Sequence, residues 1–353
     1  MTFREILGQD TSTAFFRHAR KSGRLAHAYL FTGPEGVGKG TFARALAKWI
    51  LCRKPADDAC GACDSCRQIE SGNSLSFVHL TPPTDRKGVQ KTVIDVESVR
   101  DLNARLASKI AAGDSRVVLF DDPIGDDAAN ALLKLLEEPP AGNLFLIVTQ
   151  SPASLPATIH SRCHRVRFRP IADALISKRL EERSGIAAAD ARFLARLAQG
   201  SMGKAVAYAE DGWKETRDKL REIAAGRARD PENYDMGEAL DALIKEGAEA
   251  EDSGEKDGEP DTAIADYRKS LRKTRERART CLAILALFYR DLVMSRENGA
   301  EAADPETLAE LGKVLEKVTT DRLIERLETL LQADAYLRRN ANVRLTIEWA
   351  LVA

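Results

Sequence analysis

The pattern of hydrophobic and polar positions divides the chain into two parts. In the first part, short apolar runs that predict buried strands alternate with stretches whose apolar residues recur at helical spacing. Three of these runs lie at 27–31, 116–120 and 144–148, and each leads into a polar or glycine-containing turn. Alternation of strands and helices is typical of a parallel sheet covered by helices. We therefore predict an α/β domain over residues 1–170.

The second part has helical periodicity only, and we expect two further domains in it. Short helices, including 174–182 and 191–198, predict a small α-helical domain over 171–230. Residues 231–353 are predicted to form an all-α domain, interrupted by an acidic, glycine-containing stretch at 246–262 that should be a disordered loop. Apolar residues at helical spacing give the helices after this loop a core face; they are Ile264, Tyr267, Leu271, Leu282, Leu285, Tyr289, Leu292, Leu323, Leu327, Leu330 and Leu345.

A glycine-rich turn follows the first predicted strand and has the sequence Gly-Pro-Glu-Gly-Val-Gly-Lys. Its glycines, Gly33, Gly36 and Gly38, let the backbone turn tightly and point successive N–H groups at an anion. The helix predicted from about Thr41 presents its positive dipole end to the same anion, and Lys39 supplies a point charge to terminal phosphates. A lone motif of this kind also arises as an accidental glycine-rich turn. The order of strand, loop and helix indicates a site for a nucleotide triphosphate.

The residue after the lysine departs from the phosphate-loop pattern. The pattern continues with Ser or Thr, whose hydroxyl holds Mg²⁺, but position 40 is Gly and the nearby hydroxyl belongs to Thr41. Loss of the hydroxyl removes one ligand of the metal and weakens its hold on the leaving group. We therefore expect phosphate binding to survive this change better than hydrolysis does.

Polar residues at the ends of two other strands complete the predicted nucleotide site. Asp121 follows the strand at 116–120 and is placed to reach Mg²⁺. Asp122 stands where a Glu normally polarises the attacking water, and its side chain is one methylene shorter. Paired Asp residues that simply end a strand are the alternative. Thr149 follows the strand at 144–148 and is placed to contact the terminal phosphate or the attacking water.

Four cysteines lie close together after the phosphate-loop helix, in the pattern Cys-x₇-Cys-Gly-Ala-Cys-Asp-Ser-Cys. Cys52, Cys60, Cys63 and Cys66 supply four soft ligands, which suit tetrahedral Zn²⁺. Two Cys-x₂-Cys steps that share Cys63 do not easily form two unstrained disulfides. Four unrelated buried thiols are the alternative. Because this ligand set has no His and no open position, the predicted metal site is structural rather than catalytic.

Length and net charge limit the classes of function. The 353 residues are enough for two or three domains. A formal net charge of -1 gives no overall attraction to nucleic acid, although local basic patches remain an alternative. The N-terminus has no signal-peptide pattern and no apolar run reaches about 18 residues, so we expect no membrane span and a cytoplasmic location.

Two further motifs carry a family resemblance. The run at 130–140, Asn-Ala-Leu-Leu-Lys-Leu-Leu-Glu-Glu-Pro-Pro, and the later Ser161-Arg162-Cys163 closely resemble the clamp-loader branch of the AAA+ ATPases. The resemblance covers the whole chain, most firmly residues 1–205. It implies an AAA+ phosphate-loop nucleotide-binding domain with a zinc module at 52–66. The helical domains would then be an α-helical lid and an oligomerisation collar.

The resemblance also assigns a role to one arginine and names partners. In this family the Ser-Arg-Cys motif projects its arginine across a subunit boundary, so Arg162 would act in trans as an arginine finger at a neighbour's ATP. A solvated basic strand edge, formed by Arg162 with Arg165, Arg167 and Arg169, is the alternative. The implied partners are gamma/tau and delta clamp-loader subunits in a heteropentamer, the sliding clamp, and primer-template DNA through the complex.

A third departure concerns the lid. Active loader ATPases carry an Arg in a Gly-Ser-x-Arg pattern that senses the γ-phosphate, but position 203 is Gly. With Gly40 and Asp122, this substitution is similar to the delta-prime type of bacterial clamp-loader subunit within the replisome. The resemblance therefore implies a non-hydrolysing stator of a DNA polymerase holoenzyme, with a structural Zn²⁺ and with ATP and Mg²⁺ weak or absent in its own site.

Two other hypotheses remain at this point. One is an active ATP-hydrolysing motor subunit of gamma/tau type, in which Lys39, Thr41 and Asp121 suffice for turnover. The three departures and the lack of a long C-terminal extension speak against it. The other is a zinc-stabilised binding module with no ATP role, which would leave the strand-ending Asp pair and the Ser-Arg-Cys motif unexplained.

Overall fold

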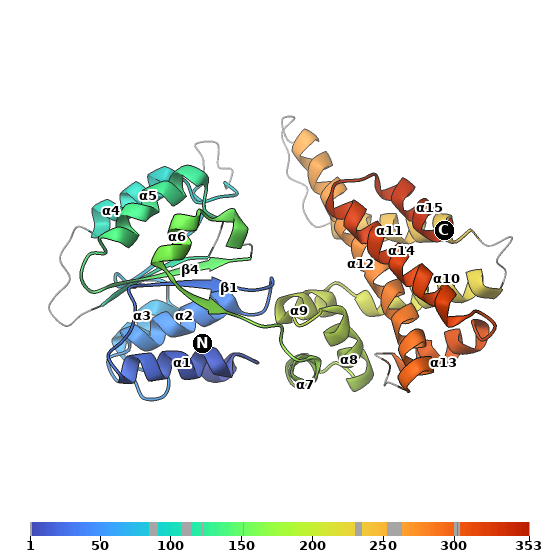
Figure 1. Ribbon diagram of the computed structural model, residues 1–353, viewed down its shortest axis with the longest axis horizontal. Helices are drawn as coiled ribbons and strands as arrows, with labels where there is room; N and C mark the ends of the chain where they lie inside the picture. Colours follow the sequence, from blue (N-terminus) through green and yellow to red (C-terminus); the bar gives the residue numbers. More distant parts are fainter. Residues whose placement is uncertain are drawn as a thin grey trace. The chain divides into compact units, whose positions relative to one another are not determined.

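The computed structural model describes residues 2–84, 91–106, 115–121, 123–150, 152–229, 235–252, 263–299, 302 and 304–352. The chain forms two compact units (Figure 1). The first, here called the sheet unit, comprises Met1–Ile176 and Gln199–Lys204. The second, the helical unit, comprises Ser177–Ala198 and Ala205–Ala353.

The sheet unit is built on five parallel strands in the order β2-β3-β4-β1-β5. Their bounds are Ala28–Thr32 for β1, Phe77–Leu80 for β2, Arg116–Phe120 for β3, Asn143–Thr149 for β4 and His164–Arg167 for β5. The predicted parallel sheet is confirmed, with its three predicted strands as neighbours. Because parallel strands end at one edge, the turn after β1 lies beside the ends of β3 and β4.

Helices cover both faces of the sheet (Figure 1). Helices α1 and α2 pack on one face around Phe16, Phe42 and Leu46, all fully buried. Helices α4, α5 and α6 pack on the other around Leu102, Leu132 and other apolar side chains. The helices of this unit are α1 Asp10–Lys21, α2 Lys39–Leu51, α3 Asp64–Glu70, α4 Val96–Leu106, α5 Asp126–Glu137 and α6 Ala157–Arg162, with short 3₁₀ turns at Phe3–Glu5 and Pro152–Ser154.

The remaining helices follow the predicted all-α pattern. They are α7 Asp173–Ser184, α8 Ala188–Leu197, α9 Met202–Glu210, α10 Trp213–Arg229, α11 Met236–Asp252, α12 Ala263–Asn298, α13 Pro305–Val314, α14 Thr320–Arg338 and α15 Val343–Val352. Among the described side chains, most of the predicted core positions of α12 and α14 are buried, including Leu282, Leu285 and Leu323. The side chains of Ile264 and Tyr267 lie outside the described part of the chain. The predictions for Leu271 and Leu345 are wrong, since both side chains are exposed. Helix α15 instead buries Ile347 and Ala350.

The predicted acidic loop at 246–262 needs a correction. Helix α11 runs through Asp252, so residues 246–252 are helical, and residues 253–262 lie outside the described part of the chain. Glutamate and alanine dominate 246–252, and both are good helix formers. The helix is already anchored by buried Leu240 and Ile244, so these residues can extend it.

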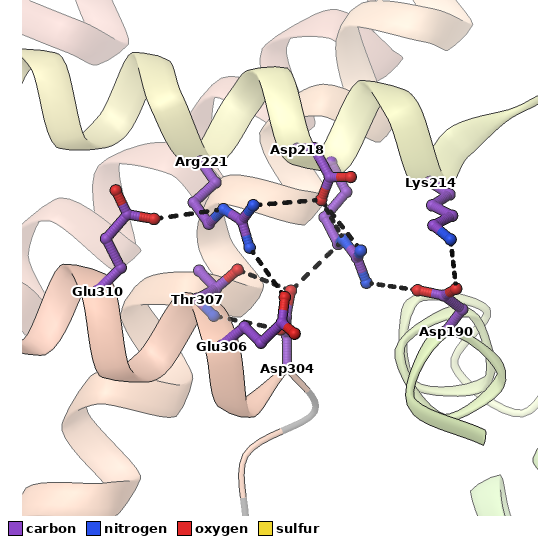
Figure 2. Close-up of polar contacts among 9 residues, drawn as sticks. Asp190, Lys214, Asp218, Arg221, Asp304, Glu306, Thr307 and Glu310 are labelled. Carbon is purple, nitrogen blue, oxygen red and sulfur yellow. Dashed lines mark hydrogen bonds and ion pairs between the residues drawn. The ribbon is translucent and has the colours of Figure 1, made fainter. Parts of the chain in front are cut away.

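A buried arginine joins three elements of the helical unit. The Arg217 side chain on α10 is only 7% exposed and lies 3.0 Å from Asp190 on α8 and 3.5 Å from Asp304, the residue before α13. Asp304 also caps α13 by accepting a hydrogen bond from the Thr307 backbone N–H. Figure 2 shows the carboxylates of Asp190 and Asp304 converging on α10. Helix α8 of the predicted lid is thus tied to helices on both sides of residue 230, and a separate lid and collar stay a prediction.

Candidate nucleotide-binding site and metal centre

The phosphate loop has the backbone that its glycines permit. Gly33 has φ +148°, and a Cβ there would lie 2.4 Å from the carbonyl oxygen of Phe168. Gly36 has φ +70°, and its Cβ would lie 2.0 Å from the hydroxyl oxygen of Ser201. A side chain at either position is therefore excluded by both conformation and contact. Gly38 is the left-handed N-cap of α2, whose first residue is Lys39.

Lys39 is buried, and its ammonium is held by the loop. The Nζ atom donates hydrogen bonds to the backbone carbonyls of Gly33 at 2.8 Å and Pro34 at 2.6 Å. Burial lowers the pKa of Lys39, while the nearby charges of Asp121 and Glu35 act in the opposite direction. The loop therefore carries a fixed cation directly at the N-terminus of α2.

The carboxylate of Asp121 occupies the space beside Gly40. A Cβ at position 40 would lie 2.2 Å from Oδ2 and 2.5 Å from Oδ1 of Asp121. The same Oδ2 atom accepts a 2.8 Å hydrogen bond from Nη2 of Arg44, one turn further along α2. Sequence reasoning placed Asp121 correctly at the loop but missed Arg44. The sequence feature that points to Arg44 is its position four residues after Gly40, which places both residues on the same face of the predicted helix.

These residues do not fit the Mg²⁺ site that the phosphate-loop pattern implies. Position 40 has no hydroxyl, and the strand-end carboxylate is paired with an arginine. Successive helical side chains are about 100° apart around the axis, so the hydroxyl of Thr41 does not take the place of one at position 40. Asp122 lies outside the described residues. Thr149 ends β4 opposite Thr32, at the same sheet edge as the loop.

The start of α9 packs against the phosphate loop within the sheet unit. The backbone N–H of Gly203 donates to the carbonyl oxygen of Gly36 at 3.1 Å, and a Cβ at 203 would lie 3.3 Å from the Gly36 Cα. Ser201 is buried and its hydroxyl accepts from the Lys204 backbone N–H. Sequence reasoning treated Gly203 only as a missing arginine. The structure gives it a close backbone contact with the loop.

Gln9 is another residue that contacts the loop. Its side chain is buried, and Nε2 donates to the backbone carbonyls of Arg169 at 2.9 Å and Val37 at 3.5 Å. It therefore joins the start of α1 to the phosphate loop and to the segment after β5. In the sequence, Gln9 is the last residue of an Ile-Leu-Gly-Gln segment that precedes α1.

The four predicted cysteine ligands come together. Their sulfur atoms all lie within 4.8 Å of one another, with Cys52 to Cys63 and Cys60 to Cys66 each at 4.0 Å. Four sulfurs around a tetrahedral Zn²⁺ are about 3.8 Å apart, given a Zn–S bond of about 2.3 Å. None of the four is in a disulfide. These cysteines could hold a metal ion, and their geometry is compatible with zinc.

Backbone N–H groups point at the sulfur atoms, as expected of thiolate ligands. The N–H of Cys60 donates to Sγ of Cys52 at 3.3 Å, and that of Cys63 donates to Sγ of Cys60 at 3.4 Å. Hydrogen bonds from the backbone of Ala62 and Cys63 lower the pKa of the Cys60 thiol. Cys52 is the C-cap of α2, so this centre begins where the phosphate-loop helix ends.

Arg162 lies away from this edge of the sheet, as the last residue of α6. Its Nη2 atom is 2.6 Å from Oε1 of Glu137 at the end of α5, and Nη1 donates to the backbone carbonyl of Thr158 at 3.1 Å. Helices α5 and α6 pack on the face opposite α2. The Arg162 side chain is 32% exposed.

Comparison with known proteins finds a family match within the sheet unit. Residues 8–172 match the protein family described as "DNA polymerase III, delta subunit". These residues are similar to that family over a little less than half of the chain. The match contains the phosphate loop, the four cysteines, Asp121 and Arg162.

Individual relatives carry names from the same polymerase. The DNA polymerase III subunit delta' of Yersinia pestis is 38% identical over 46% of this chain and 44% of its own length. Subunit tau of Escherichia coli is 34% identical over 59% of this chain and 32% of its own length. Subunit tau of Bacillus subtilis is 26% identical over 94% of this chain and 55% of its own length. The chain thus spans between about a third and just over half of these relatives.

Solved structures from Thermotoga maritima also align with the chain. A DNA polymerase III gamma subunit-related protein aligns over 95% of this chain and 97% of its own, with 15% identity and a TM-score of 0.41. A RuvB variant aligns over 89% of each chain, with 16% identity and a TM-score of 0.41. Within the part of the chain that the structure describes, every helix is too short or too polar to cross a membrane.

Proposed function

We propose that this chain is a clamp-loader subunit of a bacterial DNA polymerase III with an AAA+ fold, and that it is a delta-prime-type stator rather than a motor. The proposal is supported by the family of residues 8–172 and by the sheet order, with the phosphate loop on the strand next to β4. In this role the chain completes a neighbour's ATP site, within a complex of gamma/tau and delta subunits that places a sliding clamp on primer-template DNA.

The observation that carries the stator proposal is the pair formed by Asp121 and Arg44 beside Gly40. Hydrolysis at a phosphate loop depends on a metal held by a loop hydroxyl and a strand-end carboxylate. Here the hydroxyl is missing and the carboxylate has an arginine partner. Gly203 adds to this, because it meets the loop with its backbone and offers no side chain to a γ-phosphate.

Arg162 is the residue that we propose to act in trans. An arginine finger neutralises charge that develops on the transferred phosphoryl group, which requires a guanidinium that a neighbouring subunit can reach. Arg162 is partly exposed at the end of α6, and the bonds to Glu137, Thr158 and Ser161 hold its guanidinium in one orientation. The four cysteines would hold a structural Zn²⁺ that fixes the segment after α2.

Large apolar side chains on the last two helices support assembly through the helical unit. Leu331 and Tyr336 on α14 and Leu345 and Trp349 on α15 are all exposed, and the rings of Tyr336 and Trp349 are in contact at 5.4 Å between centroids. Exposed apolar residues of this size on neighbouring helices are typical of a surface that a partner covers. This surface would belong to the proposed collar.

The second candidate function is an ATP-hydrolysing motor of gamma/tau type. It is favoured by one observation, namely that several relatives are named tau or gamma/tau, including one that aligns over 94% of the chain. In that case Lys39 would serve a working ATP site of this chain.

DNA-stimulated ATP turnover by the reconstituted loader separates the two candidates. Arg162→Ala and Lys39→Ala are introduced in this chain alone and compared with the unchanged complex. If the chain is a stator, we expect Arg162→Ala to cause a strong loss of turnover and Lys39→Ala to cause none. If Lys39→Ala is the damaging change, the chain is a motor and the stator proposal is wrong.

A further inference from the structure

The Asp121 carboxylate interacts with the charges of two cations. Arg44 contacts its Oδ2 atom at 2.8 Å, and the charge of Asp121 also acts on the Lys39 ammonium. The Asp121 side chain is 16% exposed, whereas that of Arg44 is 42% exposed. The Asp121 carboxylate is therefore the less exposed member of the pair, and Arg44 on α2 offsets its negative charge.

In phosphate-loop proteins a divalent cation normally performs this neutralisation. The metal bridges the terminal phosphates and is held by the loop hydroxyl and the strand-end carboxylate. At this site a metal would have to displace Arg44 from Asp121 and would find no hydroxyl at Gly40. The space that a hydroxyl-bearing side chain would occupy is filled by the carboxylate itself, 2.2 Å from the Cβ position of residue 40.

The groups that bind phosphate directly do not depend on a metal. Gly33, Gly36 and Gly38 keep the loop conformation, Lys39 is fixed at its centre, and α2 presents its N-terminal N–H groups. A metal-free polyphosphate carries more negative charge than its Mg²⁺ complex. With Asp121 neutralised by Arg44, the fixed charge that this anion meets is that of Lys39, with Glu35 nearby.

We propose that Arg44 takes the place of the divalent cation, and that this phosphate loop binds a nucleoside di- or triphosphate without Mg²⁺. Arg44 acts through Asp121 as a positioning residue, because its contact is with the carboxylate. This proposal concerns the chain's own site and is independent of the role of Arg162 in trans.

Calorimetric titration of the full-length chain with ADP and with ATP tests the proposal, in excess Mg²⁺ and separately in EDTA. The expected result is an affinity that is the same within about threefold in the two conditions, or higher in EDTA. Lys39→Ala should remove binding in both, which assigns the heat to this loop. No binding in either condition, or an affinity raised more than about tenfold by Mg²⁺, overturns the proposal.

Variants at position 44 test the mechanism. In Arg44→Ala, Asp121 loses the arginine that offsets its charge, so the affinity in EDTA should fall roughly tenfold or more and Mg²⁺ should restore part of it. Arg44→Lys keeps a cation and should remain independent of Mg²⁺. Arg24→Ala removes an exposed arginine of the same unit and is the matched control. If Arg44→Ala melts at the wild-type temperature and binds equally well in EDTA, Arg44 does not replace the metal.

Discussion

Arg162 on α6 and Glu137 on α5 form an ion pair of 2.6 Å that joins two motifs 25 residues apart in the chain. The carboxylate accepts from Nη2, and the backbone carbonyl of Thr158 accepts from Nη1. The guanidinium is therefore held at two points. Within the described residues, its Nε–H and one N–H of Nη2 have no protein partner, so they are left for an incoming anion.

Removal of the Glu137 carboxylate is expected to weaken the action in trans that we propose for Arg162. Glu137→Ala should lower the neighbour's ATP turnover by about tenfold, because a catalytic group that is no longer held in place loses the advantage of prior orientation. Glu137→Gln keeps an acceptor for Nη2 and should retain most of the turnover. Turnover of the reconstituted loader is the measurement.

Two controls separate positioning from a general structural effect. Glu138→Ala removes the adjacent exposed carboxylate and should change little. In a chain that already carries Arg162→Ala, Glu137→Ala should cause no further loss. An equal loss in that background would show that Glu137 acts through something other than the arginine.

Gly36 is expected to tolerate no side chain. Gly36→Ala and Gly23→Ala both place alanine at a positive φ near 70°, which costs about 1–2 kcal/mol of stability in each. Only Gly36 has an atom in the way, the Ser201 hydroxyl oxygen, so its free energy of unfolding should fall by roughly 1–3 kcal/mol more than that of Gly23→Ala. Chemical denaturation of both variants measures the difference. Ser201→Gly should recover part of it in Gly36→Ala and none in Gly23→Ala.

The cysteine cluster is expected to bind one zinc ion that stabilises the sheet unit. Cys60→Ser and Cys66→Ser should lower the metal content determined by elemental analysis, and the melting temperature should fall by roughly 5–10 °C. Cys163→Ala changes a buried thiol outside the cluster and should leave the metal content unchanged. Purified chain without zinc, or full zinc content in Cys66→Ser, would contradict the assignment.

Arg217 is expected to be critical for the stability of the helical unit. Arg217→Met leaves Asp190 and Asp304 without their buried partner, and their side chains are only 12% and 7% exposed. Breaking a buried ion pair on one side costs about 3–5 kcal/mol. Lys214→Met removes an exposed partner of Asp190 and should have a small effect. Urea unfolding followed by circular dichroism measures both variants, and similar midpoints for the two would refute this account.

Local patterns predicted the parts of the site that are close in sequence. The order of β1, loop and α2 was encoded in one apolar run followed by glycines and a lysine, and the four cysteines lie within fifteen residues. The pair of Arg44 and Asp121 was not predictable in this way. Its members are 77 residues apart, and a sequence pattern shows which residues end a strand but not which partner a carboxylate takes.

The sequence did not predict the full length of α11 or the contact of Gly203 with the phosphate loop, and the reasons differ. Composition suggested disorder at 246–252, but an anchored helix continues through good helix formers. Gly203 was read against a family pattern that concerns side chains, whereas its contact with Gly36 is made by the backbone.

Helix α2 begins at Lys39 in the phosphate loop and has Cys52 as its C-cap. A single helix of 13 residues, about 20 Å long, therefore joins the proposed nucleotide site to the proposed metal centre. An oxidant that converts the four thiols to disulfides would pull on one end of this helix. The other end would transmit the strain to the glycines of the loop, two of which, Gly33 and Gly36, pack closely against neighbouring segments. Oxidative damage to the cysteine cluster is thus expected to reach phosphate binding at a distance.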